Sequence, residues 1–206
     1  LAAKAKSSDD RVLLLPLSWK TPVLGPAAIA LWRMDARRKV RWMAKSLGER
    51  ARLLEIGSGP GSLLEALRQE RHEVEAVDID HSAYDTCLRA QLFDGRTLPY
   101  RDDAFDAAIL ATTLHHAADP DRLIAEAARV APKVIIIEDV YRSEAQRRLT
   151  LFADSLTNLE FEGHPHNNRD DAGWRGAFAA AGLTIVRAET KPYAGLFLQA
   201  LYELRR

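Results

Sequence analysis

The chain has 206 residues, of which 47% are hydrophobic and 28% are charged, and its 29 Lys and Arg side chains balance 29 Asp and Glu side chains. This length and composition exclude a disordered or collagen-like chain and predict one domain around a single core. The absence of a basic excess disfavours wholesale binding to nucleic acid, so nucleic acid is not an expected partner.

Cysteine content and hydropathy point to a protein of the cytoplasm. The single cysteine, Cys87, cannot form an internal disulfide, which fits a reducing compartment. The most apolar stretch, residues 12–32, contains Lys20 and three prolines, so it falls short of the roughly 20 apolar residues of a membrane span. Asp9 and Asp10 stand where a signal peptide carries positive charge. We therefore expect a cytoplasmic protein without a membrane span.

Residues 1–48 are expected to form a polar lead followed by a cap helix. Apolar residues recur at steps of three and four from Ile29 to Leu47, which places them on one buried stripe, and Gly48 is a typical helix end. Four basic residues form a neighbouring stripe, which we interpret as a solvated face: Arg37, Arg38, Arg41 and Lys45.

From residue 51 the chain alternates short apolar runs with helical stretches, a pattern typical of a parallel sheet with crossover helices. The expected strands are 52–56, 73–78, 91–94, 105–111, 133–138, 183–189 and 196–203. The expected helices are 62–71, 82–91, 120–130, 143–159 and one from about 171 to 182. Asp119 and Ser143 are predicted N-caps, and Cys87 is expected to be buried inside its helix.

A glycine-rich turn follows the first expected strand, at Glu55-Ile56-Gly57-Ser58-Gly59-Pro60-Gly61. Glycines allow a sharp turn and let a ligand approach the backbone, while amides at the next helix start attract a carboxylate or phosphate. The dinucleotide-binding fingerprint needs its third glycine at position 62, where Ser62 stands. An NAD-dependent oxidoreductase is therefore the less favoured interpretation of this turn.

The pattern Glu55-x-Gly57-x-Gly59-x-Gly61 resembles that of the class I S-adenosylmethionine-dependent methyltransferases. The similarity covers residues 51–140 and continues in order through Asp78, Asp94, Leu98-Pro99-Tyr100, Phe105-Asp106, Leu114-His115-His116 and Glu126-x-x-Arg129-Val130. The last two segments are similar to the subgroup that contains ubiquinone and menaquinone methyltransferases and many small-molecule enzymes. The chain departs from the pattern at Asp80, where Ser or Thr is common, and in lacking a Pro-Gly-Gly turn before the fifth strand, so that connection must be shortened.

The resemblance implies a fold and a division of the chain. The fold is α/β, with a Rossmann-like, doubly wound, seven-stranded and mostly parallel sheet whose last strand is antiparallel, and with an N-terminal helical cap. Residues 1–48 would form the lead and cap helix, and residues 49–206 would form the methyltransferase domain.

The resemblance also implies S-adenosyl-L-methionine as cofactor. Glu55 would lie near its amino group, and backbone amides of the glycine turn would meet its carboxylate. Asp78 would bind the ribose diol, and Asp94 with Gly95 would face the adenine. The full set of implied cofactor-binding residues is Glu55, Gly57, Ser58, Gly59, Gly61, Asp78, Ile79, Asp94 and Gly95.

Histidines are the candidates for proton transfer, because imidazole titrates near neutral pH. His115, just past the fourth strand, is the first candidate, followed by His166, with His116 and His164 as further ones. An ordinary loop histidine is the alternative for each. His164 and His166 flank a proline, but no further ligand spacing supports a metal, so no metal site is expected.

These observations predict a methyltransferase for a small-molecule acceptor, with O- or C-methylation favoured. Residues 111–115 lack the Asn/Asp-Pro-Pro-Tyr sequence of enzymes that methylate amino groups of nucleobases, which disfavours DNA. The cap helix and the loop from 156 to 172 would form a lid over the acceptor. The alternative is a catalytically silent module that binds the cofactor and a protein partner. The chain is expected to be a monomer or a homodimer.

Overall fold

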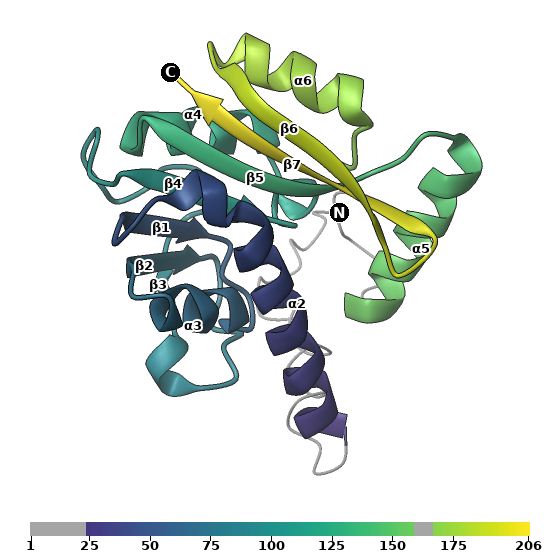
Figure 1. The fold of residues 1–206 in the computed structure, drawn as a ribbon, viewed down its shortest axis with the longest axis horizontal. Helices are drawn as coiled ribbons and strands as arrows, with labels where there is room; N and C mark the ends of the chain where they lie inside the picture. Colours follow the sequence, from purple (N-terminus) through teal and green to yellow (C-terminus); the bar gives the residue numbers. More distant parts are fainter. Residues whose placement is uncertain (1–23, 159–166) are drawn as a thin grey trace, which may run out of the picture.

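A seven-stranded sheet forms the centre of the computed structural model, which describes residues 24–158 and 167–206 (Figure 1). The strands are β1 Arg52–Ile56, β2 Glu73–Asp78, β3 Gln91–Leu92, β4 Ala107–Ala111, β5 Lys133–Val140, β6 Thr184–Tyr193 and β7 Phe197–Arg205. The helices are α2 Leu24–Leu47, α3 Ser62–Gln69, α4 Pro120–Val130, α5 Glu144–Asn158 and α6 Asp171–Ala180. Two short 3₁₀ turns, η2 Thr86–Leu88 and η3 Leu114–His116, complete the described part.

The strand order is β3-β2-β1-β4-β5-β7-β6. The neighbours from β3 to β5 are parallel, whereas β7 pairs antiparallel with both β5 and β6. The predicted Rossmann-like sheet with an antiparallel last strand is therefore confirmed. Because the chain winds outward from β1 in both directions, the crevice at the carboxyl ends of β1 and β4 is where such a sheet binds ligands.

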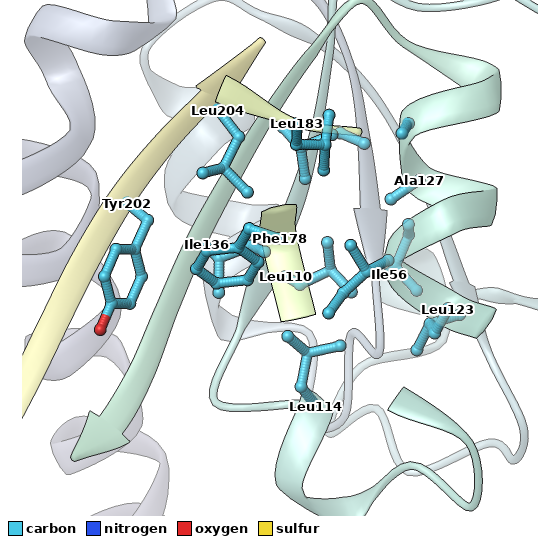
Figure 2. Close-up of a cluster of buried hydrophobic side chains, with 14 of the residues drawn as sticks. Ile56, Leu110, Leu114, Leu123, Ala127, Ile136, Phe178, Leu183, Tyr202 and Leu204 are labelled. Carbon is cyan, nitrogen blue, oxygen red and sulfur yellow. The ribbon is translucent and has the colours of Figure 1, made fainter. Parts of the chain in front are cut away.

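Apolar side chains cover both faces of this sheet. On one face Ile56, Leu110 and Ile136 pack against α4 and α6, as Figure 2 shows around Phe178. On the other face α2 and α3 pack through Met43 and a group of leucines. The four central residues of β5, Val134 to Ile137, are fully buried, as their continuous apolar run predicts.

The predicted N-caps are confirmed. The Asp119 carboxylate accepts a hydrogen bond from the Arg122 amide at 3.0 Å, and the Ser143 hydroxyl accepts one from the Gln146 amide at 3.2 Å. Each side chain satisfies an amide that the first helical turn leaves unpaired. Only Ala131 and Pro132 separate α4 from β5, so the shortened connection is also present.

The predicted helix over 82–91 is wrong. Only η2 forms there, and Cys87 is exposed rather than buried. Two hydrogen bonds compete with a helix: the Asp85 side chain accepts from the Cys87 amide at 3.0 Å, and the Tyr84 amide donates to the distant Pro60 carbonyl at 3.1 Å. The segment is thereby fastened to the glycine turn in an irregular conformation.

The cap helix α2 has the predicted buried stripe. Val40, Met43 and Leu47 are buried, and the N-terminal half of the helix projects beyond the sheet (Figure 1). Three of the four residues of the basic stripe are exposed, but Arg38 is partly buried and binds Asp35 and Gln199. Among the helices in the described ranges, none is long and apolar enough to cross a membrane.

Candidate functional site

The glycine turn lies at the carboxyl end of β1, and its glycines have left-handed backbone angles. The φ values are 76° at Gly57, 51° at Gly59 and 83° at Gly61. A Cβ atom on Gly57 would overlap the Thr113 side chain, and one on Gly61 would lie 2.8 Å from Leu88 Cβ. A Cβ atom on Gly59 would meet no atom within 4 Å. Close packing therefore requires two of the glycines, and the third borders open space.

The amides of the three glycines donate within the chain. Gly57 donates to the Val77 carbonyl at 2.9 Å, Gly61 to the Ser58 carbonyl at 3.0 Å, and Gly59 to the Asp78 carboxylate at 2.6 Å. The three glycine amides are therefore engaged within the chain, whereas the amides at the start of α3 have no side-chain cap. Gly57 and Gly59 thereby fasten the turn to β2, and Gly61 closes the turn itself.

Asp78 is the carboxylate that faces the glycine turn. Besides the Gly59 amide, its carboxylate accepts from the Ile79 amide at 2.6 Å, and burial raises its pKa against these two lowering contacts. Asp80 is exposed and accepts from the Ser82 hydroxyl. Of Asp78 and Asp80, only Asp78 is placed against the turn.

Ile79, Asp94 and Gly95 lie together beyond β2. Ile79 is 67% exposed although it is apolar, and a Cβ atom on Gly95 would lie 3.2 Å from Ile79 Cγ2. The Asp94 carboxylate closes its own turn by accepting from the Arg96 and Thr97 amides at 2.8 and 2.7 Å, which lowers its pKa. The three residues thus form a small surface, apolar at Ile79 and negatively charged at Asp94.

Glu55 is a buried carboxyl group under the glycine turn. It is 2% exposed, and its Oε2 accepts from the Ser58 hydroxyl at 3.1 Å. Burial is the largest cause that raises its pKa to about 8, while the Ser58 hydrogen bond opposes the shift. The folded chain therefore holds this proton at pH values where an exposed glutamate has lost it.

We expect the Glu55→Gln variant to remove a pH-dependent part of the stability. Between about pH 4.5 and about pH 8 the folded state keeps the Glu55 proton and the unfolded state releases it, so rising pH destabilises the wild type. Urea unfolding across this range should show the free energy of unfolding of the wild type falling relative to that of Glu55→Gln. The exposed Glu73→Gln serves as control, and parallel curves for wild type and Glu55→Gln would contradict the assignment.

His115 and Glu138 form a buried pair at the ends of β4 and β5. His115 Nδ1 lies 2.6 Å from Glu138 Oε2, and the two side chains are 2% and 0% exposed. Glu138 Oε1 accepts from the Thr113 and Leu114 amides at 2.9 and 2.7 Å. Because a carboxylate only accepts, Nδ1 carries the proton that points toward Glu138. The imidazole is thereby held in one orientation.

The other candidate histidines have different positions. The His116 ring is tilted by 45° to that of His115, with ring centroids 4.0 Å apart. His164 and His166 lie outside the described residues. In the described part of the chain, no three His, Cys, Asp or Glu side chains are arranged to hold a metal ion.

A polar cluster under α2 was missed in the sequence. Lys39 is 9% exposed, and its Nζ lies 3.0 Å from both Asp35 Oδ2 and Thr112 Oγ1. Beside it, Asp139 of β5 and Gln199 of β7 are hydrogen-bonded. Asp35 and Lys39 are one turn apart and next to the apolar stripe, a spacing that could have indicated an inward-facing ion pair.

Comparisons with known proteins bear on the family and the fold of the chain. A family model described as a methyltransferase domain matches residues 32–188. No curated protein sequence matches the chain.

Three solved structures illustrate the likeness of the fold. A SAM-dependent methyltransferase from Methanosarcina mazei has a TM-score of 0.62 at 17% identity, over 80% of this chain and 96% of that one. Magnesium protoporphyrin IX methyltransferase from Synechocystis PCC 6803, with bound SAH, has a TM-score of 0.61 at 17% identity, over 91% of this chain and 89% of that one. The 4+2 cyclase SpnF has a TM-score of 0.63 at 20% identity, over 82% of this chain and 81% of that one. Likeness at such low identity concerns the fold, which SpnF shares although it is named for another reaction.

Proposed function

Because the chain belongs to the methyltransferase-domain family and is a class I enzyme dependent on S-adenosyl-L-methionine, we propose that it methylates a small-molecule acceptor at oxygen or carbon. The observation that carries the cofactor part of this proposal is the contact between Asp78 and the glycine turn at the carboxyl ends of β1 and β2. Cytoplasmic location and the division into a cap, residues 1–48, and a catalytic domain, residues 49–206, belong to the same proposal.

Three features of the described residues fit this cofactor. The Cβ position of Gly59 is open, so a ligand can approach the backbone there. Asp78 offers a half-buried carboxylate next to it, a suitable acceptor for two ribose hydroxyls. Ile79 leaves an apolar side chain exposed beside Gly95, where the flat adenine ring would cover it.

The remaining contacts are proposed from charge and position. Asp94 would accept from the adenine amino group, and Glu55 and Ser58 would lie at the methionine amino group. Since the three glycine amides are engaged, the methionine carboxylate would meet the backbone amides at the start of α3, which has no side-chain cap.

The bound cofactor supplies an electrophilic methyl group on a positively charged sulfur. The chain has to align the acceptor with that group, and alignment of two bound reactants contributes roughly 7 to 11 kcal/mol to lowering a barrier. Where the acceptor must lose a proton, we propose His115 as proton acceptor, with Glu138 fixing its orientation. His116 and His166 are the second candidates. The lid over the acceptor would consist of α2 and the segment from 156 to 172.

We expect Asp78→Asn to weaken binding of S-adenosylhomocysteine by about 10- to 100-fold, as hydrogen bonds to a charged group are worth about 1.5 to 3 kcal/mol. In the wild type the Gly59 and Ile79 amides each donate to one carboxylate oxygen of Asp78. An asparagine places its NH₂ group against one of these two donors. Calorimetric titration of purified protein measures the effect. Asp80→Asn is the matched control and should bind as the wild type does; equal losses in both variants would refute the proposed ribose contact.

Methyl transfer itself separates the enzyme from the silent module. Protein incubated with methyl-labelled cofactor and a pool of small metabolites should label a small product. Label in tRNA or DNA, with none in small molecules, would refute the proposed acceptor class. Binding of S-adenosylhomocysteine without any transfer would favour the silent module that holds a protein partner.

A further inference from the structure

One carboxylate near the proposed site is held in place by an amide whose own orientation is fixed. Asp139 Oδ1 accepts from Gln199 Nε2 at 2.9 Å. Gln199 is 2% exposed, and its Oε1 accepts from the Arg38 guanidinium. Because Arg38 can only donate, it forces the oxygen of the Gln199 amide toward itself and the nitrogen toward Asp139.

The second carboxylate oxygen of Asp139 remains available. In the described ranges Oδ2 has no hydrogen-bond partner, and no cation forms an ion pair with Asp139, whereas the nearby Asp35 binds both Arg38 and Lys39. Asp139 is only partly buried, and Oδ2 is not among the enclosed polar atoms without partners. A ligand atom can therefore reach an acceptor whose position the Gln199 bond has already set.

Asp139 stands beside the proposed reaction centre. It lies near the carboxyl end of β5, opposite Gln199 in the β5–β7 register, and β5 is the neighbour of β4, whose end carries Thr112. The charged and titratable groups that interact with it include His115, Glu138, Lys39 and Tyr193. Burial is the largest cause that raises its pKa, while the charge of His115, the hydrogen bond from Gln199 and the charge of Lys39 lower it and favour the ionised carboxylate.

The charges around Asp139 select among the groups that it could bind. A protonated amine would be attracted by Asp139 and Glu138, but it would also stand near Lys39, near the Arg38 guanidinium behind Gln199, and near the positive sulfur of the cofactor. A carboxylate ligand would be repelled by Asp139 itself. A neutral hydroxyl donates one hydrogen bond to Asp139 and is repelled neither by the nearby positive charges nor by Asp139.

We propose that Asp139 is an acceptor-binding residue that receives a hydrogen bond from a hydroxyl group of the methyl acceptor, and that the acceptor is a hydroxyl compound such as a phenol or an enol. This inference rests on the proposed function. It also fits methylation at either oxygen or carbon. A phenol or enol can receive a methyl group at its oxygen or at the carbon next to the one that bears this oxygen. Arg38 and Gln199 are then positioning residues for Asp139.

Three probes of similar size test the hydroxyl preference: phenol, anisole and benzylamine. Their binding to the full chain with S-adenosylhomocysteine present is measured by ligand-observed NMR. We expect phenol to bind the wild type about 10-fold more tightly than anisole, which lacks the donor, and more tightly than benzylamine. In Asp139→Asn the outer position becomes an NH₂ group, so the phenol-to-anisole ratio should fall to within about twofold.

Controls separate the inference from the proposed function. Calorimetry with S-adenosylhomocysteine and thermal unfolding should give wild-type values for Asp139→Asn. The exposed Asp103→Asn is the matched control: it should give wild-type values in both measurements and should also keep the preference for phenol. If S-adenosylhomocysteine does not bind, the proposed function fails. If it binds but the wild type does not prefer phenol, or the preference survives in Asp139→Asn, the Asp139 inference is wrong. Tighter binding of benzylamine would overturn the hydroxyl class.

Discussion

Gly57→Ala is expected to lower the free energy of unfolding by about 2 to 5 kcal/mol and to abolish measurable binding of S-adenosylhomocysteine. A non-glycine residue in a left-handed conformation costs about 1 to 2 kcal/mol, and an added methyl group in a packed site costs about 1 to 3 kcal/mol. Both costs arise here, because φ at Gly57 is 76° and the new Cβ would overlap Thr113. Relief of the overlap would displace the loop after β4 or the glycine turn, and with either the cofactor site.

The neighbouring glycine provides the matched control. Gly59→Ala carries the conformational cost alone, because a Cβ atom there meets nothing within 4 Å, so it should destabilise by about 1 to 2 kcal/mol. Urea unfolding and calorimetry measure both variants. Removing the Thr113 side chain beyond Cβ, in Gly57→Ala/Thr113→Ala, should restore part of the stability. Equal costs for Gly57→Ala and Gly59→Ala would show that the contact with Thr113 is unimportant.

His115→Asn is expected to lower the rate of methyl transfer by about 10² to 10⁴, the usual contribution of a general base. Asparagine is chosen because its Nδ2 can donate to Glu138 in place of Nδ1, which keeps the buried carboxylate paired. What the variant lacks is the far ring nitrogen, Nε2. The rate is measured with labelled cofactor on the product identified in the wild type.

The affinity for S-adenosylhomocysteine decides how the His115→Asn result is interpreted. A slow variant with wild-type affinity supports proton transfer by His115, and His116→Asn should then remain active. If affinity and thermal stability fall together with the rate, the His115–Glu138 pair has a structural role in the loop after β4. A fully active His115→Asn would exclude His115 as the base.

The fold was predictable where the determining signals are local. The strand over residues 52–56, the cap at Asp119 and the glycine turn each depend on residues a few positions apart. The spacing of the glycines also led to Asp78, because parallel strands bring their carboxyl ends to one edge. The helix over 82–91 was mispredicted because the contact that prevents it is not local. Its apolar spacing gives no sign of the hydrogen bond between Tyr84 and Pro60.

The polar cluster under α2 could not be predicted because its partners are distant in the chain. Arg38 and Gln199 are 161 positions apart, and Lys39 and Thr112 are 73 apart. In the sequence Arg38 looks the same as its exposed neighbours Arg37 and Arg41. Only the packing of α2 across the ends of β4, β5 and β7 decides which basic side chain turns inward.

The position of β7 between β5 and β6 has a consequence for synthesis on the ribosome. Strands β1 to β5 can pair as soon as they emerge, but β6 has no partner in the sheet until β7 follows it. Meanwhile the open edge of β5 offers its eight residues, Lys133–Val140, to any extended segment nearby. A nascent chain paused within β6 therefore carries an aggregation-prone edge that the complete hairpin covers.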